Sequence, residues 1–240
     1  MSAVLLIARR EVYAYLRSPL GFSIIAAALL IEGLWFHLNA LTRPLLSAEV
    51  LQEFFNGASG VTMVAAIVLS MRLLAEERQA GSITLLNTAP VRDLEIVLGK
   101  FLSAFLVIAL LTALSVYMPL LILVNGKVSL GHVAVGYAGL LLLGGAVTAI
   151  GLFASALARS QVIAAIVGAA VLVVLLLLWL AARAVEPPLN TFLARLALHH
   201  ENFRPFMQGV LELRSVVFYL AVTYFFLLAA TKTLEARRWR

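Results

Sequence analysis

The chain has 240 residues, of which 63% are hydrophobic and only 12% charged, with a mean hydropathy of +1.03. A water-soluble domain is nearer half apolar and a quarter charged, so this composition excludes a soluble fold. The formal net charge of +6 comes from Lys and Arg residues scattered between apolar runs, which argues against a nucleic-acid-binding face. Because the sequence has no cysteine, disulfides, thiolate metal sites and cysteine nucleophiles are excluded as well.

The first nineteen residues, 1–19, are predicted to form a cytoplasmic interfacial helix. Within Ala3–Arg17, apolar residues recur at helical spacing, and Arg9, Arg10 and Arg17 lie off that stripe, where they can meet anionic lipid headgroups. These charges also interrupt every apolar stretch, so we do not expect a cleavable signal peptide. The alternative is a simple positively charged flank before the first span.

Six apolar segments are long enough to cross a bilayer, which requires about 20 residues per helix. They are predicted at residues 20–38, 54–74, 100–124, 133–158, 161–182 and 215–233. The second is the weakest at its start, because Asn56, Gly57, Ser59 and Gly60 dilute its apolar character. We therefore expect an all-α membrane protein with a single transmembrane domain covering residues 1–240.

The Lys and Arg residues in the connections indicate the orientation, because cytoplasmic loops carry the excess of positive charge. With the amino terminus inside, twelve of the 18 Lys and Arg residues lie on the cytoplasmic side. We therefore expect a multi-pass protein of a bacterial inner membrane with both termini in the cytoplasm.

The connection 75–99 is the most charged cytoplasmic stretch, and it also keeps several apolar residues. Gly81 and Pro90 divide it into short pieces. An apolar face on a polar connection is typical of a segment that docks against a partner or the membrane surface. A solvated loop with short interfacial helices fits the residues equally well.

The outer connection 183–214 is long and apolar, and is predicted to be a re-entrant or interfacial loop between the fifth and sixth spans. Its motif His199-His200-Glu201 could line an exit pathway or interrupt an interfacial helix. Adjacent histidines on a helix point about 100° apart, so a metal site is not expected.

Glu32 lies inside the first span, where an ionisable group is costly. It is either a residue of a translocation or proton pathway, or a neutral or hydrogen-bonded residue near the outer end of the span.

The sequence carries no phosphate-binding loop and no hydrolase or metalloprotease motif, so we expect no enzyme activity and no cofactor on this chain.

Three stretches resemble the ABC-2 type permeases, the membrane subunits of ATP-binding-cassette transporters, and most of all the branch of gliding-motility and multicopper-enzyme-maturation permeases. The first runs from Met71 to Ile83 and continues through Ala89-Pro90-Val91 to Phe101. The second is Gly151–Leu157 followed by Arg159-Ser160-Gln161. The third runs from His200 to Tyr219 and ends in Glu235-Ala236-Arg237-Arg238-Trp239.

This resemblance implies a type V exporter-like fold in which segment 75–99 is the coupling segment that seats on a separate ATPase. It places Glu76, Glu77, Arg78, Gly81, Ser82, Ile83, Pro90 and Val91 in or around that contact. It further implies two ATPase copies that carry ATP and Mg²⁺, and a second permease chain that is identical or related. Membrane lipid and a periplasmic protein are the remaining candidate partners, and nucleic acid is not one.

The function expected from the resemblance is export or mechanical work across the inner membrane, driven by ATP hydrolysis on the partner. An ATP-independent secondary transporter or channel is one alternative. The other is a non-transporting scaffold of a motility or maturation complex.

Overall fold

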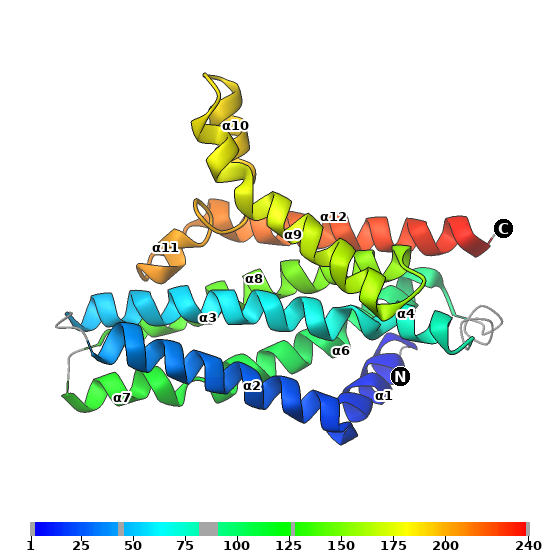
Figure 1. Cartoon of the computed structure of the whole chain (residues 1–240), viewed down its shortest axis with the longest axis horizontal. Coiled ribbons are helices and arrows are strands. Elements are labelled where there is room, and N and C mark those ends of the chain that lie inside the picture. Colours follow the sequence, from blue (N-terminus) through cyan, green and yellow to red (C-terminus); the bar gives the residue numbers. More distant parts are fainter. Residues whose placement is uncertain (1–2, 43–45, 82–90, 126–127, 239–240) are drawn as a thin grey trace.

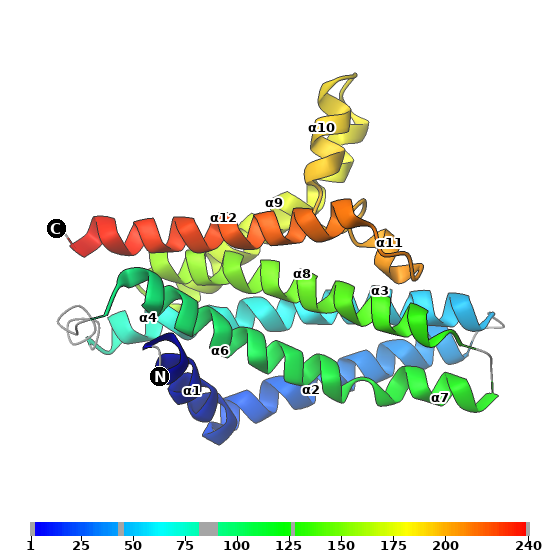
Figure 2. The same cartoon turned by 180° about the vertical axis from the view of Figure 1, so that it is seen from behind.

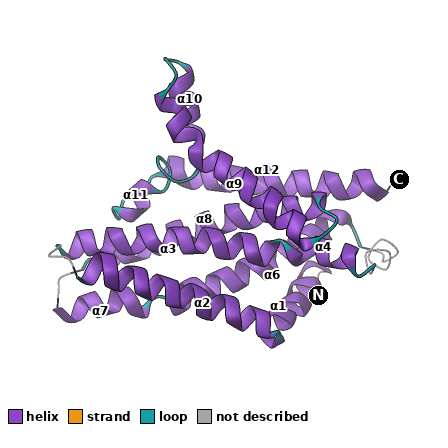
Figure 3. Ribbon diagram, in the orientation of Figure 1, coloured by secondary structure: helices purple, strands orange, loops and turns teal. Residues whose placement is uncertain are grey.

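A computed structural model describes residues 3–42, 46–81, 91–125 and 128–238 of the chain, in which every regular element is helical (Figure 3). The helices are α1 (Ala3–Arg17), α2 (Pro19–Phe36) with the π-helical turn η1 (His37–Leu41), α3 (Ser47–Ser70), α4 (Arg72–Gln79), α6 (Asp93–Leu114), α7 (Tyr117–Asn125), α8 (Leu130–Leu157), α9 (Gln161–Arg183), α10 (Leu189–Leu196), α11 (Arg204–Met207) and α12 (Leu213–Arg238).

Helix α8 lies at the centre of the bundle and packs against α3, α6, α9 and α12 (Figures 1 and 2). Its helical neighbours approach closely where it carries glycine. At Gly136, for example, a Cβ atom would lie 2.1 Å from the ring of Phe55, so only glycine leaves room for that ring. The glycine-rich sequence of this span therefore serves the packing of the core.

Within the described residues, six helices are long and apolar enough to span a membrane. Large apolar side chains remain exposed on α2, α9 and α12, among them Leu30, Val174 and Phe225. Such faces are stable in contact with lipid tails, which accept apolar side chains without the cost that water imposes. The chain is thus a multi-pass α-helical membrane protein, as the sequence predicts.

The second spanning helix begins at Ser47, earlier than the apolar run that starts at Phe54. Two of the residues that weaken the sequence signal, Gly57 and Ser59, are buried inside the bundle. The Ser59 hydroxyl donates to the Asn56 carbonyl at 2.7 Å, and Gly57 lies against the indole of Trp35. These groups are satisfied by the protein, so they do not end the helix.

The third span is interrupted at Ser115 and Val116, where α6 ends and α7 begins. Pro119 cannot donate a backbone hydrogen bond, which favours a break shortly before it. The Ser115 hydroxyl bonds the Thr112 carbonyl at 3.0 Å and lies 3.2 Å from the Tyr137 hydroxyl of α8. The Ser115 side chain therefore has hydrogen-bonding partners within the protein at the break between α6 and α7.

The first part of α9 packs against α8, and α10 folds back along the far end of α9, which projects with it from the side of the bundle (Figure 1). The segment that follows, residues 197–203, returns to the core. Leu198 and Phe203 are fully buried there, and the Tyr219 hydroxyl donates to the Leu198 carbonyl at 2.7 Å. Whether this region re-enters the membrane, and whether α1 lies on a membrane surface, remain predictions.

Candidate functional site

The amino terminus, the end of α4, the start of α6 and the carboxyl terminus all lie at one end of the bundle (Figures 1 and 2). The candidate site is built at this end from α1, α4 and α6. Of the predicted coupling residues, Glu76, Glu77 and Arg78 lie on α4. Gly81 lies two residues after the end of α4, and Val91 lies half-buried shortly before α6. Ser82, Ile83 and Pro90 lie outside the described residues.

Four charged side chains from three helices meet beside α4, and we refer to Arg10, Glu11, Glu77 and Lys100 as the charge cluster. The Lys100 ammonium of α6 is only 1% exposed and lies 2.8 Å from Glu77 Oε1 and 3.3 Å from Glu11 Oε1. Arg10 lies 3.0 Å from Glu11 Oε1 and 3.5 Å from Glu77 Oε1. One buried cation therefore links α1 to α4, the first part of the predicted coupling segment.

The charge cluster is stable because opposite charges compensate for the loss of water. Burial alone would raise the pKa of Glu11, but Lys100 and Arg10 offset it and hold that pKa below its ordinary value. The cluster borders a cavity of about 400 Å³, which Tyr15 and Arg72 also line.

The joint between α3 and α4 lies at Met71 and is held by side chains from other helices. Ser155 Oγ of α8 accepts from the backbone N–H groups of Leu74 and Ala75 at 3.0 and 2.9 Å, and donates to the Met71 carbonyl at 2.9 Å. The Tyr15 hydroxyl of α1 donates to the Leu69 carbonyl at 2.7 Å. Both α8 and α1 are thus fastened to the same joint.

The far end of α4 is also anchored to the core. The Arg78 guanidinium donates to the Ala158 carbonyl at 2.7 Å, at the carboxyl end of α8. Arg72 and Glu76 form a pair one turn apart, with Nε and Oε2 separated by 2.8 Å. These contacts fix the direction in which α4 leaves the bundle.

Gly81 ends α4 in the left-handed region, with a φ of +71°. Replacing Gly81 with alanine should destabilise this turn by about 1–2 kcal/mol, because an L side chain strains left-handed backbone. Gly81→Asn should cost less, since asparagine tolerates this conformation. Hydrogen exchange of the Ala80 and Gly81 amides measures the effect, and equal protection in the two variants would contradict the conformational explanation.

The predicted pathway residues do not form one site. Glu32 lies on α2 and is 2% exposed, and its Oε2 has no hydrogen-bond partner among the described residues. His199 Nε2 lies 2.8 Å from Ser59 Oγ, His200 stacks on Trp179 with ring centroids 4.5 Å apart, and Glu201 is exposed. Within the described part of the chain, no group of three His or carboxylate residues is arranged to hold a metal ion.

The buried position of His199 predicts a dependence of stability on pH. Burial, with a smaller contribution from His200, lowers the pKa of His199 to about 4, whereas an unfolded imidazole has a pKa of about 6.5. Between these values the unfolded chain binds a proton that the folded chain excludes, so stability is full above the unfolded pKa and falls as the pH falls. We expect a loss of about 2 kcal/mol between pH 7 and pH 5.

Detergent-solubilised protein titrated with SDS at both pH values measures this loss. His199→Gln keeps a hydrogen-bond donor toward Ser59 but does not titrate, so it should be nearly insensitive to the same change of pH. If the wild type and this variant lost stability equally, another group would be responsible.

Several residues of the site are not predicted from the sequence. Arg10 is expected there only to meet lipid headgroups and Glu11 only to interrupt an apolar stretch. Lys100 is expected only to begin a span, and Ser155 only to belong to a family-like stretch. The local signal for Lys100 is its position at the edge of an apolar run. If such a lysine is buried, it requires an anionic partner, so the position predicts an ion pair.

Comparison with known proteins supports the predicted family. Residues 38–197, from the turn η1 to the residue after α10, match the family described as ABC-2 family transporter protein. No curated protein matches the chain. The match includes the first two of the three stretches that resemble the family, but not the third, which begins at His200. It does not specify a branch of the family. The chain belongs to the ABC-2 family of transporter proteins.

Proposed function

We propose that the chain couples ATP hydrolysis on a separate ATPase subunit to export or mechanical work across a bacterial inner membrane. Membership of the ABC-2 family points to the membrane subunit of an ABC transporter and to an ABC ATPase as its partner. ATP and Mg²⁺ would be bound by the ATPase, in two copies, beneath two permease chains that are identical or related. A periplasmic partner and the cytoplasmic location of both termini belong to the same proposal.

The observation that carries the proposal is the fastening of α4 to α1, α6 and α8. The Lys100–Glu77 pair, the Ser155 contacts and the Arg78–Ala158 bond connect the base of the coupling segment to the core of the bundle. A force applied to α4 would therefore reach the spanning helices through these contacts.

The topology can be tested because the native chain has no cysteine. Gln79→Cys places a thiol at the exposed end of α4, and Leu189→Cys places one at the start of α10. A membrane-impermeant maleimide should label Leu189→Cys in intact cells, and Gln79→Cys only in inverted vesicles. Labelling of Gln79→Cys from outside would overturn the proposed orientation.

The coupling itself is tested by affinity purification of the permease from its native host. We expect a soluble ATPase to co-purify, and the double variant Glu77→Gln with Gly81→Ala to lose its stimulated turnover while remaining folded. An exposed change outside the site, Glu186→Gln, serves as the control. Undiminished stimulated turnover in the double variant would refute the assigned contact.

A second candidate function is secondary transport driven by an ion gradient. The observation in its favour is the carboxyl group of Glu32 buried in the first span. Transport by purified protein in liposomes under an ion gradient, without ATP, would favour this function.

A further inference from the structure

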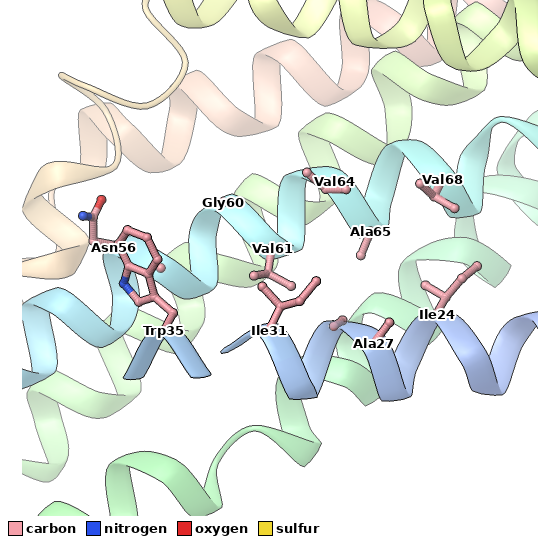
Figure 4. Close-up of a pocket in the computed structure, with 12 residues that line it drawn as sticks. Ile24, Ala27, Ile31, Trp35, Asn56, Gly60, Val61, Val64, Ala65 and Val68 are labelled. Carbon is pink, nitrogen blue, oxygen red and sulfur yellow. The ribbon is translucent and has the colours of Figure 1, made fainter. Parts of the chain in front are cut away.

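Helix α2 turns its one acidic side chain, Glu32, toward the interior of the bundle. Its neighbours Ile31 and Leu34 are more than half exposed, so α2 faces lipid on their side. Ile31 also lines an apolar groove between α2 and α3, of about 550 Å³ (Figure 4). Among the described residues, the walls of this groove carry no charge and do not include Glu32. Any partner of the Glu32 carboxyl group therefore lies inside the bundle.

Inside the bundle, α2 packs against α7 just after the break in the third span. A Cβ atom added at Gly33 would lie 3.6 Å from the methyl carbon of Met118. Tyr137 of α8 is close enough to Glu32 for an electrostatic interaction between the two side chains. Glu32 Oε2 nevertheless forms no hydrogen bond within the described residues.

No basic group compensates a charge at this position. Within the described part of the chain, no charged side chain acts on Glu32. The titratable residues that the adjoining outer elements carry are His37 of η1, Glu49 and Glu53 of α3, and Tyr117 of α7. The charge cluster, with Lys100, lies beside α4 at the other end of the bundle. An ionised carboxyl group would therefore be an isolated buried charge, which is very costly.

The break in the third span fixes the direction of the hydrogen bonds near Glu32. In a continuous helix the Thr112 carbonyl would accept from the Val116 N–H, but that N–H donates to the Ala113 carbonyl at 3.3 Å. The Ser115 hydroxyl takes its place and donates to the Thr112 carbonyl at 3.0 Å. Because a hydroxyl has a single proton, Tyr137 must be the donor in its 3.2 Å contact with Ser115.

The Tyr137 oxygen is then left with lone pairs only, so it can bind a further group only as an acceptor. A carboxylate has no proton to donate to it, whereas a protonated carboxyl group does. The rings of Phe54 and Phe55, whose centroids lie 6.3 and 5.5 Å from that of Tyr137, make the surroundings apolar. A proton on Glu32 completes a hydrogen-bonded chain through Tyr137 and Ser115 to the Thr112 carbonyl.

We propose that Glu32 is a proton-binding site, which carries a proton in this conformation and donates it in a hydrogen bond to Tyr137 Oη. The proton is the ligand, and α2, α8 and the break between α6 and α7 enclose it. Moving α2 away would separate Glu32 from Tyr137 and admit water to the carboxyl group. The proton therefore binds this arrangement of the helices in preference to an open one, and it stabilises the closed position of α2.

Infrared spectroscopy at neutral pH detects this proton directly. The C=O stretch of a protonated carboxyl group lies above the amide I band, where exposed carboxylates do not absorb, and a maltoside detergent adds no carbonyl of its own. We expect a band there that Glu32→Gln loses and the exposed change Glu186→Gln retains. Glutamine is neutral and of the same size, so the SDS midpoint should stay that of the wild type. Absence of the band, or its survival in Glu32→Gln, would overturn the proposal.

Two further variants test the direction of the chain. Tyr137→Phe removes the acceptor of the Glu32 proton and should shift the band to higher frequency. Ser115→Ala removes the acceptor of the Tyr137 proton, which then turns to the Glu32 carbonyl oxygen and should shift the band to lower frequency. Tyr117→Phe, at an exposed position of α7, should leave the band in place. An unshifted band, or shifts in the same direction, would overturn Tyr137 as the partner.

The proton site is independent of the proposed coupling function. The infrared measurement uses the permease alone, so a missing band leaves ATPase coupling standing, and a failure of coupling leaves the proton site intact. The site requires no net movement of protons across the membrane, which the liposome experiment measures separately.

Discussion

Replacing Lys100 with methionine should lower the free energy of unfolding by about 3–5 kcal/mol. Methionine fills a similar volume, but it leaves Glu11 and Glu77, which are 18% and 15% exposed, facing each other with one cation fewer. The cost comes from uncompensated buried negative charge and not from lost packing. Titration of the detergent-solubilised protein with SDS, followed by circular dichroism, measures it.

Two further variants separate charge from shape at this position. Lys100→Arg keeps the charge and should retain part of the lost stability, although its planar head does not fit the same geometry. Adding Glu77→Gln to Lys100→Met removes one of the two carboxylates that have lost Lys100 and should restore part of the stability. If the double variant were as unstable as the sum of the two single variants, the ion pair would not be the cause.

Replacing Ser155 with alanine should destabilise the protein by about 2–5 kcal/mol. The change removes the acceptor of the Leu74 and Ala75 N–H groups and the donor to the Met71 carbonyl, all in the buried interior. In a continuous helix those two N–H groups would bond carbonyls four residues earlier, but the joint at Met71 directs them to Ser155. The same SDS titration applies.

Ser103→Ala is the matched control for Ser155→Ala. Ser103 is also fully buried, but its hydroxyl donates only to the Lys100 carbonyl of its own helix, at 2.7 Å. Its removal leaves no N–H group without a partner, and the loss should stay within about 1 kcal/mol. A similar loss in both variants would mean that the joint does not depend on the Ser155 bonds.

The number of spans and the family follow from the sequence, because both depend on local patterns. A run such as Val171–Leu180 is apolar at every position, and no tertiary contact is needed to recognise it. The start of the second span does not follow from the sequence, because Gly57 packs against Trp35 and Ser59 contacts His199, both of which are distant in the chain.

The charge cluster illustrates what a sequence alone leaves open. Glu11 and Lys100 are 89 residues apart, and no periodicity relates them. Ser155 is likewise an ordinary small residue of an apolar span until the joint at Met71 turns two N–H groups toward it. Such contacts depend on how helices cross, which is a property of the assembled bundle.

The bonds at Met71 also limit how this protein can move. Separating α4 from α8 would break the three hydrogen bonds of Ser155, and separating α1 from α3 would break the Tyr15 bond, so these bonds hold the four helices together near Met71. Helices α2, α9 and α12 carry large exposed apolar side chains on their outer faces. We therefore expect a conformational cycle of this chain to displace these outer helices relative to the helices fastened at Met71.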